Sequence, residues 1–310
     1  MERVAIFGAA GAIGHAVAGE LRRRGLWFRV VGRRRAALEP LEAAEIVEAD
    51  LTELRAAGDA ARGVDTIIYT VGIPYHRFDL HPRLMTTTVE AAVVTKVTRL
   101  MVVSSVYSYG RPETPRVAET HPRLPHTHKG RMRKEQEDIA LQAQKDGLLQ
   151  AAVVRLPDFY GPHADNSLAN PIFRAAMDGR KANWLGSVDL PHEFIFTPDA
   201  GRGIVELASR MEAYGEAWNL GGPSPISGRE FITGVYTQAG AKPRWRTAGP
   251  AMLWVAGWFN TQMRELVEMQ YLHQTPVILD DSKAAKLLGE VPKTPYRDAI
   301  AETLRWMKAA

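Results

Sequence analysis

Short hydrophobic runs alternate with longer segments of helical character along the first half of the chain. The runs predict six strands, at residues 4–7, 28–31, 45–48, 66–70, 99–104 and 150–155. Continuous apolar strands separated by helices are typical of a parallel sheet that is covered on both faces, with right-handed crossovers. In such a sheet, ligands bind at the C-terminal ends of the strands. The residues that follow each strand are therefore the first candidates for a functional site.

The alternation ends near residue 157. Beyond it, proline and glycine are frequent, tryptophans occur at positions 184, 245, 254 and 258, and helices dominate after residue 228. We expect an α/β fold with a Rossmann-type doubly wound sheet in residues 1–160, completed by later segments at about 190–222. A smaller C-terminal substrate lobe would comprise residues 161–190 and 223–310. Within 282–288 a helix is predicted, because Asp280 and Asp281 precede it and Gly289 follows it.

The composition limits the kinds of chemistry. The 310 residues include no cysteine, which excludes disulfides, thiolate catalysis and cysteine-ligated metals. The nine histidines lack the spacing of metal ligands, so no metal site is expected. The net charge of +4 is dispersed and the basic clusters lack interleaved aromatic residues, so we expect no nucleic-acid partner.

The sequence also predicts no association with a membrane. The longest apolar run, at 252–259, is expected to pack as a helix and is shorter than the ~18 residues of a bilayer span. Residues 1–14 lack the basic and hydrophobic regions of a signal peptide. We therefore expect a cytoplasmic protein.

A glycine motif directly follows the first predicted strand and leads into a helix expected at 16–24. Gly8 would permit a tight turn, Gly11 would let backbone N–H groups approach a pyrophosphate, and Gly14 would let the helix pack against the strand. The helix N-terminus adds unpaired N–H groups and a partial positive charge. Strand, turn and helix together predict a dinucleotide-binding crevice, with cofactor contacts at Gly8, Ala10, Gly11, Ala12, Ile13 and Gly14.

Arginines occupy the end of the second predicted strand. Gly32 is followed by Arg33, Arg34 and Arg35, with no Asp or Glu at this point to accept a bond from a ribose 2′-hydroxyl. The planar guanidinium fork suits a phosphate dianion. We therefore expect Arg33 and Arg34 to bind a 2′-phosphate, and NADP to be the cofactor in preference to NAD. The alternative is a solvated charge run at the start of a helix.

Further motifs follow the later strands in a fixed order. They are Asp50-Leu51, Thr70-Val71-Gly72, Ser104-Ser105-Val106-Tyr107-Ser108-Tyr109-Gly110, Arg155-Leu156-Pro157-Asp158-Phe159-Tyr160-Gly161-Pro162, Trp218-Asn219-Leu220-Gly221-Gly222 and Asp281-Ser282-Lys283-Ala284-Ala285-Lys286-Leu287-Leu288-Gly289. Over almost its whole length the chain thus resembles the extended short-chain dehydrogenase/reductase superfamily, in its epimerase/dehydratase group. The resemblance implies that Asp50 contacts the adenine amino group and that Pro157 lies near the nicotinamide. It implies further cofactor contacts at Leu51, Val71, Gly72, Ser104 and Lys129, and a homodimer formed through helices packed on the sheet.

The catalytic centre departs from the pattern of this family. Its members carry a Tyr-x-x-x-Lys pair on the helix after the fifth strand, whereas here no tyrosine lies between Tyr109 and Tyr160. If Gly130 is aligned with the glycine that often follows the tyrosine, Lys129 takes the tyrosine position and Arg133 the lysine position, one helical turn later. Some atypical members carry a similar Lys-Gly-x-x-Arg stretch. A slipped register would use His128 or Lys134 instead.

These positions suggest roles. An ammonium can protonate or stabilise an oxyanion, so Lys129 would be the proton donor and Ser105 the second donor on the same substrate oxygen. Arg133 would hold ribose hydroxyls or a cofactor phosphate. The alternative is that Lys129 and Arg133 only form an exposed basic helix face. The substrate pocket is expected to include Tyr107, Tyr160 and His192, and Tyr107 or Tyr109 could also replace the missing phenol.

The resemblance and the residues together favour an NADP-dependent oxidoreductase. It would transfer a hydride to or from a carbonyl or activated alkene of a small, fairly apolar molecule. A second hypothesis is an epimerase or dehydratase that uses the dinucleotide transiently. A third is a non-catalytic NADP-binding sensor, for which the loss of the Tyr/Lys pair is the main argument.

Overall fold

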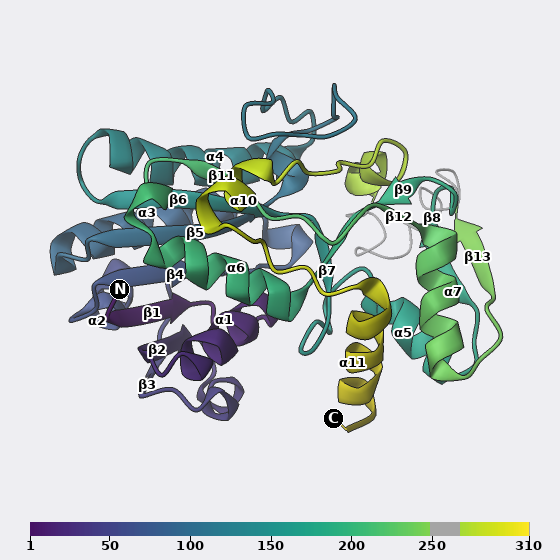
Figure 1. Cartoon of the computed structure of the whole chain (residues 1–310). Helices are drawn as coiled ribbons and strands as arrows, with labels where there is room; N and C mark the ends of the chain where they lie inside the picture. The colour runs from purple at the N-terminus through teal and green to yellow at the C-terminus, as the bar shows by residue number, and fades with distance from the viewer. Residues whose placement is uncertain (249–266, 310) are drawn as a thin grey trace.

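Seven strands form one parallel sheet at the centre of the larger lobe (Figure 1). The computed structural model describes residues 1–248 and 267–309. The strand order is β3-β2-β1-β4-β5-β6-β11, so the direction of winding reverses between β1 and β4. The six predicted strands and the doubly wound parallel architecture are confirmed. The strands are β1 (Arg3–Phe7), β2 (Trp27–Gly32), β3 (Glu45–Glu48), β4 (Thr66–Tyr69), β5 (Arg99–Ser105), β6 (Gln150–Leu156) and β11 (Ala217–Asn219).

Helices cover both faces of this sheet and enclose two hydrophobic cores. One face carries α1 (Ala12–Arg23), α6 (Thr197–Ser209) and α10 (Ser282–Leu288), and the other carries α2 (Leu54–Ala61), α3 (Leu80–Thr95) and α4 (His128–Lys145). Helix α1 begins at residue 12 and not at 16, because the backbone turns directly from Gly11 into the helix. The predicted helix at 282–288 is confirmed: Asp280 Oδ1 accepts a bond from the Ser282 N–H at 3.0 Å.

In the described residues of the smaller lobe, three helices and three two-stranded sheets surround an aromatic core (Figure 1). The helices are α5 (Asn170–Met177), α7 (Gly228–Ala239) and α11 (Tyr296–Ala309). The strand pairs are β7 (Asp158–Tyr160) with β10 (Phe194–Phe196), β9 (Pro191–His192) with β12 (Ile226–Ser227), and β8 (Ala182–Leu185) with β13 (Trp245–Ala248). Short 3-10 turns complete the described chain: η1 (Arg35–Ala37), η2 (Glu39–Leu41), η3 (Tyr75–Arg77), η4 (Val106–Ser108), η5 (Met211–Ala213) and η6 (Gln270–His273).

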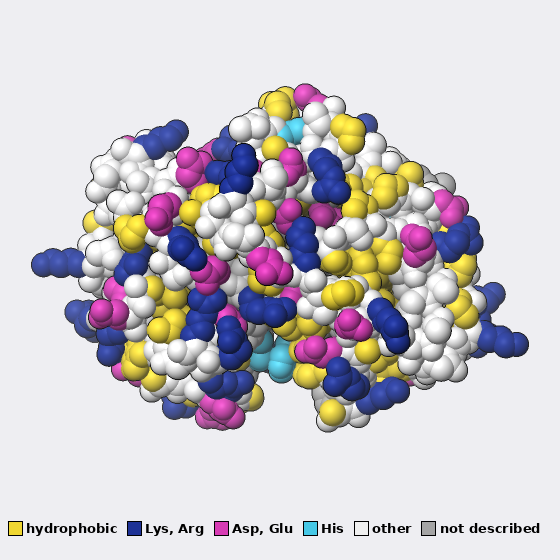
Figure 2. Space-filling view, in the orientation of Figure 1, with side chains coloured by type: hydrophobic (Ala, Val, Ile, Leu, Met, Phe, Trp, Pro, Cys, Tyr) yellow, Lys and Arg dark blue, Asp and Glu magenta, His cyan; other side chains and the backbone are white. Residues whose placement is uncertain are grey.

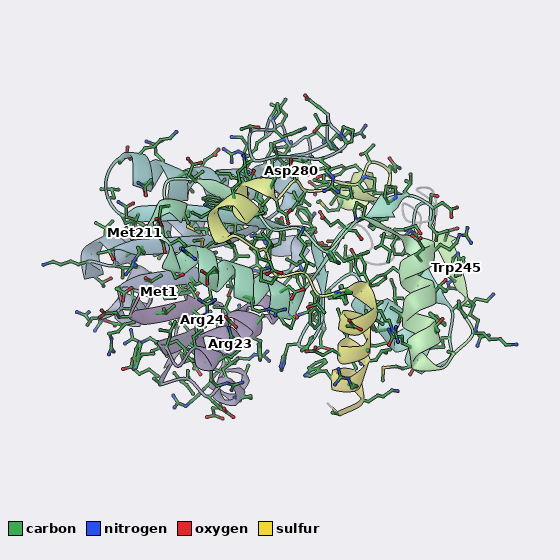
Figure 3. The ribbon with its side chains drawn as sticks, viewed as in Figure 1. Met1, Arg23, Arg24, Met211, Trp245 and Asp280 are labelled. Atoms are coloured by element: carbon green, nitrogen blue, oxygen red, sulfur yellow. The ribbon has the colours of Figure 1, made fainter. Side chains whose placement is uncertain are left out.

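Two of the tryptophans in the second half of the chain, Trp184 and Trp245, pack against other residues of the smaller lobe. Trp184 is buried in the aromatic core of the smaller lobe. Trp245 lies on β13 at the outer edge of that lobe, with the Arg229 guanidinium 5.2 Å from the centre of its ring (Figure 3). Trp254, Trp258 and the predicted helix at 252–259 lie outside the described residues. Among the described residues no helix is long and apolar enough to cross a membrane, and no group of His, Asp and Glu gathers to hold a metal.

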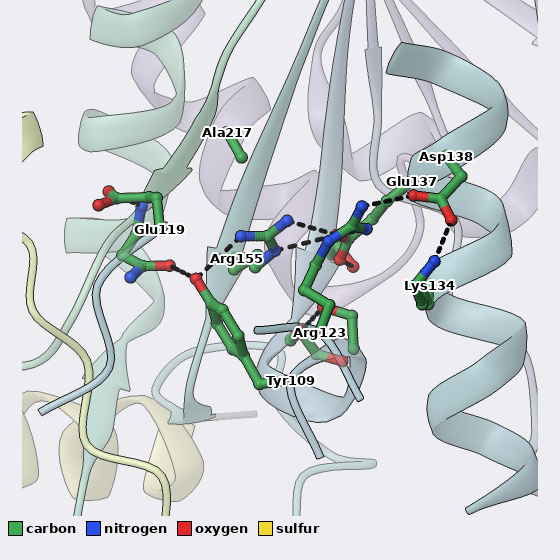
Figure 4. A network of polar contacts seen from close by, with 12 residues as sticks. Tyr109, Glu119, Arg123, Lys134, Glu137, Asp138, Arg155 and Ala217 are labelled. Atoms are coloured by element: carbon green, nitrogen blue, oxygen red, sulfur yellow. Dashed lines mark hydrogen bonds and ion pairs between the residues drawn. The ribbon is translucent and has the colours of Figure 1, made fainter. Parts of the chain in front are cut away.

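A buried ion pair joins helix α4 to the sheet (Figure 4). Glu137 Oε2 accepts bonds from Arg155 Nε at 2.9 Å and Nη2 at 2.7 Å, and Glu137 Oε1 accepts from Ser104 Oγ at 2.6 Å. Arg155 Nη1 donates in turn to the Tyr109 hydroxyl at 2.9 Å, which donates to Asn219 Oδ1 at 2.8 Å. One continuous set of bonds therefore connects β5, α4, β6 and β11.

Charge pairing outweighs the cost of burying these groups. Burial alone would raise the pKa of Glu137, but the Arg155 guanidinium and the Ser104 hydroxyl hold it below its usual value of 4.5. A carboxyl whose pKa is lowered on folding contributes stability above its unfolded pKa and loses that contribution as the pH falls through the folded value. This pair therefore supports the fold at neutral pH and weakens below pH 4.5.

We predict that Glu137→Gln lowers the free energy of unfolding by about 3–5 kcal/mol at pH 7.5, because it leaves the Arg155 charge buried without its counter-ion. Asp138→Asn, one position further along α4, is the matched control, since its partners Arg123 and Lys134 are partly exposed. It should cost less than about 1 kcal/mol. Urea unfolding followed by circular dichroism measures both changes. Equal effects of the two substitutions would show that the buried pair has no special role.

Candidate active site

The candidate site lies at the C-terminal edge of the sheet, where the strand order reverses between β1 and β4. Four segments meet there: the glycine turn after β1, the loop after β4, η4 after β5 and the start of α4. The register between β5 and β6 places Ser105 opposite Leu156, directly before Pro157. The residues predicted from strand ends are thus brought to one edge of the sheet.

The glycine turn has the shape of a phosphate cradle. Gly8 has φ +85°, and a Cβ at this position would lie 2.6 Å from Val71 Cα. At Gly14 a Cβ would lie 2.5 Å from the Ala9 carbonyl oxygen, so only glycine lets α1 approach β1 this closely. Gly11 caps α1 without any side-chain acceptor, and no acidic residue occupies the first turn. The N–H groups that begin the helix therefore suit an anionic pyrophosphate.

The other predicted cofactor residues extend from this turn. Arg33 and Arg34 are exposed after β2, and Leu51 is buried after β3. Asp50 accepts bonds from the Thr52 backbone and hydroxyl, which lower the pKa of its carboxyl, and the charges of Arg33 and Arg77 lower it further. The Asp50 carboxylate and the Arg33 guanidinium therefore attract each other electrostatically at the C-terminal ends of β2 and β3.

Helix α4 begins directly against η4. Thr127 caps the helix by accepting a bond from the Gly130 N–H at 3.1 Å. A Cβ at Gly130 would lie 2.7 Å from both the Tyr107 carbonyl oxygen and Pro125 Cβ, so a larger residue would push the helix away. Lys129, which directly precedes this contact, is only 3% exposed. An exposed basic face is therefore wrong for Lys129.

The Lys129 ammonium is paired with a residue from the far end of the chain. Lys129 Nζ donates to Glu268 Oε2 at 2.7 Å, and the Lys129 backbone N–H donates to Glu268 Oε1 at 2.8 Å. Burial would raise the pKa of Glu268, but its bonds to Lys129 hold it below the usual value. Nζ also lies 5.7 Å from the centre of the Tyr75 ring. The ammonium is thus fixed between a carboxylate and an aromatic face.

The two serines at the end of β5 differ in their hydrogen bonds. The Ser105 hydroxyl is buried, and within the described ranges no protein group bonds to it. It is consequently available to a bound molecule. The Ser104 hydroxyl instead donates to Glu137 and belongs to the buried ion-pair network. The Ser104 hydroxyl proton is therefore not available to a cofactor, and a cofactor contact at Ser104 stays a prediction.

Arg133 lies one turn after Lys129 and turns inward. Its guanidinium is 5.4 Å from the centre of the Phe78 ring, and Nη1 donates to Gln136 Oε1 at 2.9 Å. Nε has no acceptor in the part of the chain that the structure describes. Burial lowers the pKa of this guanidinium. A half-buried guanidinium with an unused donor suits ribose hydroxyls or a phosphate oxygen.

The residues of the slipped register lie elsewhere on α4. Half-exposed His128 pairs with Asp79 at 2.5 Å, and partly exposed Lys134 pairs with Asp138 at 2.6 Å. Neither is buried beside η4 as Lys129 is. Lys129 and Arg133 both lie near Tyr75, and Ser105 directly precedes η4, against which α4 begins. The catalytic roles of these three residues stay predictions.

A phenol pair and a carboxyl complete the polar lining. The Tyr75 and Tyr107 hydroxyls are 2.9 Å apart. Asp158, two residues after β6, is close enough for its charge to act on Tyr75, Tyr107 and Tyr271, and burial raises its pKa to about 6. Tyr107 therefore pairs with Tyr75, a partner that sequence reasoning missed, and its place in a substrate pocket stays a prediction.

Two other predicted pocket residues lie in the smaller lobe. Tyr160 is 1% exposed and packs among Phe173, Phe196 and Phe231, so its placement in a pocket wall is wrong: the aromatic core encloses it. His192 is buried against Trp184, and burial lowers its pKa to about 3, so its ring is neutral at physiological pH.

Glu268 and Asp158 also escaped the sequence analysis. Glu268 is separated from Lys129 by 139 positions, and no local pattern links the two. Asp158 lies inside the quoted Arg155–Pro162 motif, where a carboxylate directly after a buried strand could have been noticed. Its significance depends on the phenols around it, which come from three separate loops.

Comparisons with known proteins identify the family of this chain. A sequence model of the NAD-dependent epimerase/dehydratase family matches residues 4–221. A dTDP-glucose 4,6-dehydratase of Actinoplanes is 26% identical over 221 residues, which are 71% of this chain but only 63% of that enzyme. A 3β-hydroxysteroid dehydrogenase/Δ5→4-isomerase of Mycobacterium tuberculosis is 24% identical over 97% of this chain and 89% of its own length.

Solved structures share the fold. A dTDP-glucose 4,6-dehydratase of Streptomyces venezuelae with NAD bound has a TM-score of 0.83 and 21% identity, covering 99% of this chain and 97% of that one. A UDP-glucuronic acid 4-epimerase of Bacillus cereus in complex with NAD has a TM-score of 0.82 and 17% identity, covering 99% of both chains. The predicted family and fold are confirmed.

We predict that Asp158→Asn raises the free energy of unfolding at pH 7.5 by about 1–3 kcal/mol and leaves it nearly unchanged at pH 4. The pKa of Asp158 rises from 3.8 to about 6 on folding, so the folded protein binds a proton that the unfolded chain has lost. Stability therefore falls as the pH rises from about 4 to 6, and the amide removes this loss.

Thermal unfolding at the two pH values measures the difference. Asp189→Asn is a control of opposite sign, because the Arg229 bond lowers the pKa of exposed Asp189, and its loss should slightly reduce stability at pH 7.5. A destabilising effect of Asp158→Asn at pH 7.5 would contradict the raised pKa of this half-buried carboxyl.

Proposed function

The chain belongs to the NAD-dependent epimerase/dehydratase family, and from that premise we propose that it catalyses reversible hydride transfer between a nicotinamide dinucleotide and a small, largely apolar secondary alcohol or its ketone. Two of its curated relatives carry the names of enzymes, which supports a catalytic role over the sensor hypothesis. The observation that carries the proposal lies around η4. The Ser105 hydroxyl, just before η4, is buried with no hydrogen-bond partner among the described residues, and the buried Lys129 ammonium comes from the start of α4, which packs against η4.

The chain's own residues would perform the proton chemistry. When bound, the dinucleotide supplies the hydride donor or acceptor. Ser105 would donate a hydrogen bond to the substrate oxygen and so polarise the carbonyl. Lys129 would give a proton to that oxygen during reduction and take it back during oxidation. Gly8, Gly11 and Gly14 would hold the pyrophosphate, and Arg133 the ribose beside the nicotinamide.

The lining supports an apolar substrate. Among the described residues of the smaller lobe, Arg174 pairs with Asp165 and Arg180 with Asp178, and all four side chains are largely exposed. These arginines do not converge on a diphosphate. His192 is neutral and lies against Trp184. The relative that spans 97% of this chain is a hydroxysteroid dehydrogenase/isomerase, an enzyme whose name denotes such a substrate.

A second candidate function is an epimerase or dehydratase that oxidises its substrate transiently and returns the hydride. The family model, the Actinoplanes dehydratase and the epimerase from Bacillus cereus favour this candidate. Both candidates share the first step, oxidation of a carbinol carbon. They differ in whether reduced cofactor accumulates, which absorbance at 340 nm reports directly.

The cofactor is a nicotinamide dinucleotide, and we propose that it is NADP. The exposed Arg33 and Arg34 follow β2 without a carboxylate on that strand end, which supports binding of a 2′-phosphate. The similar structures described above contain NAD. The choice therefore depends on this chain's own arginines.

We predict that Lys129→Met reduces turnover at least about 100-fold, the usual contribution of a proton donor, while cofactor affinity stays within a few-fold. The assay uses cyclic secondary alcohols and their ketones, followed at 340 nm. Ser105→Ala should reduce turnover by a similar factor, because one hydrogen-bond donor is lost. Lys134→Met is the matched control on the outer face of α4 and should leave turnover unchanged. Unaltered turnover in Lys129→Met would remove Lys129 from the mechanism.

We predict that Arg33→Ala weakens NADP binding about tenfold or more and NAD binding less than about twofold, because only NADP carries the 2′-phosphate. Titration calorimetry measures both affinities. Arg35→Ala is the control, since Arg35 already pairs with Glu39 at 3.5 Å. Equal losses for the two cofactors would assign Arg33 to the solvated surface and leave NAD as the cofactor.

A further inference from the structure

We propose that Glu268 is the positioning residue for Lys129, and that the proton donor of this site is therefore assembled from two distant parts of the chain. The inference rests on the proposed function only for the role of Lys129 as donor. The pairing itself is a property of the fold. No motif of the sequence analysis includes Glu268, and it lies beyond residues 4–221, which the family model matches.

One carboxylate holds both ends of Lys129. Glu268 Oε1 accepts the Lys129 backbone N–H at 2.8 Å, which fixes the carboxylate on the first turn of α4. Glu268 Oε2 accepts from Nζ at 2.7 Å, which fixes the far end of the side chain. A lysine side chain has four flexible carbons and would otherwise sample many rotamers. The two bonds select the rotamer that keeps Nζ in the buried space beside η4.

The segment that carries Glu268 is itself anchored to the site. Met269, Tyr271 and Leu272 pack into one hydrophobic cluster with Phe78, Val106 and Tyr107. The Tyr271 ring also meets the ring of His126, just before α4, with centroids 4.6 Å apart. The backbone that carries Glu268 is thus held by residues packed on η4, the segment that follows Ser105 and contacts the start of α4. Its carboxylate can hold Lys129 because its own position is fixed.

The electrostatic reason for such a partner is simple. A buried ammonium needs an opposite charge nearby, because transfer from water is costly for an isolated ion. Glu268 supplies that charge with 25% of its side chain exposed, so one side of the pair remains open to water. The neighbouring Arg133 adds a second positive charge one helical turn away, which increases the need for an anion at this end of α4.

The test measures Lys129 directly and requires no substrate. Full-length wild type and Glu268→Gln are labelled with limiting acetic anhydride at pH 8, and the acetylated fraction of each lysine is read by peptide mass spectrometry. The glutamine is nearly isosteric but uncharged, so we expect labelling of Lys129 to rise on the order of tenfold. Labelling of exposed Lys96 in the same sample should not change. Melting temperature and dinucleotide affinity confirm that the fold is retained.

Two further variants separate positioning from general bracing. Glu268→Asp keeps the charge and should restore most of the low reactivity of Lys129. Asp138→Asn removes the partner of Lys134 on the same helix and should raise labelling of Lys134 but not of Lys129. Once a substrate is known, Glu268→Gln should reduce kcat with little change in KM, because Lys129 acts on the reacting oxygen.

Unchanged labelling of Lys129 in a folded Glu268→Gln protein would overturn the proposal. A similar rise at all lysines, accompanied by a large drop in melting temperature, would also overturn it, since Glu268 would then be a structural brace. Because labelling needs no turnover, these results differ from a failure of the proposed function. In that case the labelling pattern is as expected, but no alcohol or ketone reacts.

Discussion

The buried pair between Glu137 and Arg155 is the interaction on which the site depends. It fastens α4 to β6, and through Ser104 and Tyr109 it reaches the end of β5 and the edge strand β11. Buried charges are costly, but here both Glu137 oxygens accept hydrogen bonds and all three Arg155 nitrogens donate one, so the network offsets that cost. Helix α4 carries Lys129 and Arg133, and β5 ends in Ser105. The Glu137–Arg155 pair thus helps to set the position of Lys129 relative to the Ser105 hydroxyl, although it contacts neither residue.

Close backbone approach is the second constraint. Gly8 lets the turn after β1 approach the Val71 backbone, Gly14 lets α1 approach Ala9, and Gly130 brings α4 against η4, with contacts that leave no room for a Cβ. The first two shape a place for the cofactor pyrophosphate, whereas the third buries Lys129. Small residues therefore determine where the charged groups of this chain lie. The mixture of basic and acidic side chains over the visible surface gathers into no single-sign patch, which is consistent with charge being used locally (Figure 2).

The strands of the sheet and the candidate residues on the glycine turn and α4 could be predicted from the sequence, whereas Glu268 could not. Six strands and the glycine crevice followed from local patterns of hydrophobicity and turn residues, and alignment on Gly130 identified Lys129. Glu268 could not be predicted, because a partner 139 positions away leaves no periodic or motif signal. Tyr160 was misplaced for a related reason: its motif places it after β6, but the five rings around it come from α5, β10, α7 and α11 of the smaller lobe.

Replacing a phenol by an ammonium changes what the surrounding structure must provide. A tyrosine donor is neutral before it gives up its proton, whereas a lysine donor carries a charge into the interior and requires a counter-ion there. The structure provides Glu268 at 2.7 Å, on a segment that also packs against η4. Substitution at residue 129 is therefore coupled to the C-terminal segment, where the smaller lobe meets the sheet edge. Lys129 and Glu268 act together as a proton donor and its counter-ion. The role of Lys129 therefore cannot be inferred from the motif on α4 alone.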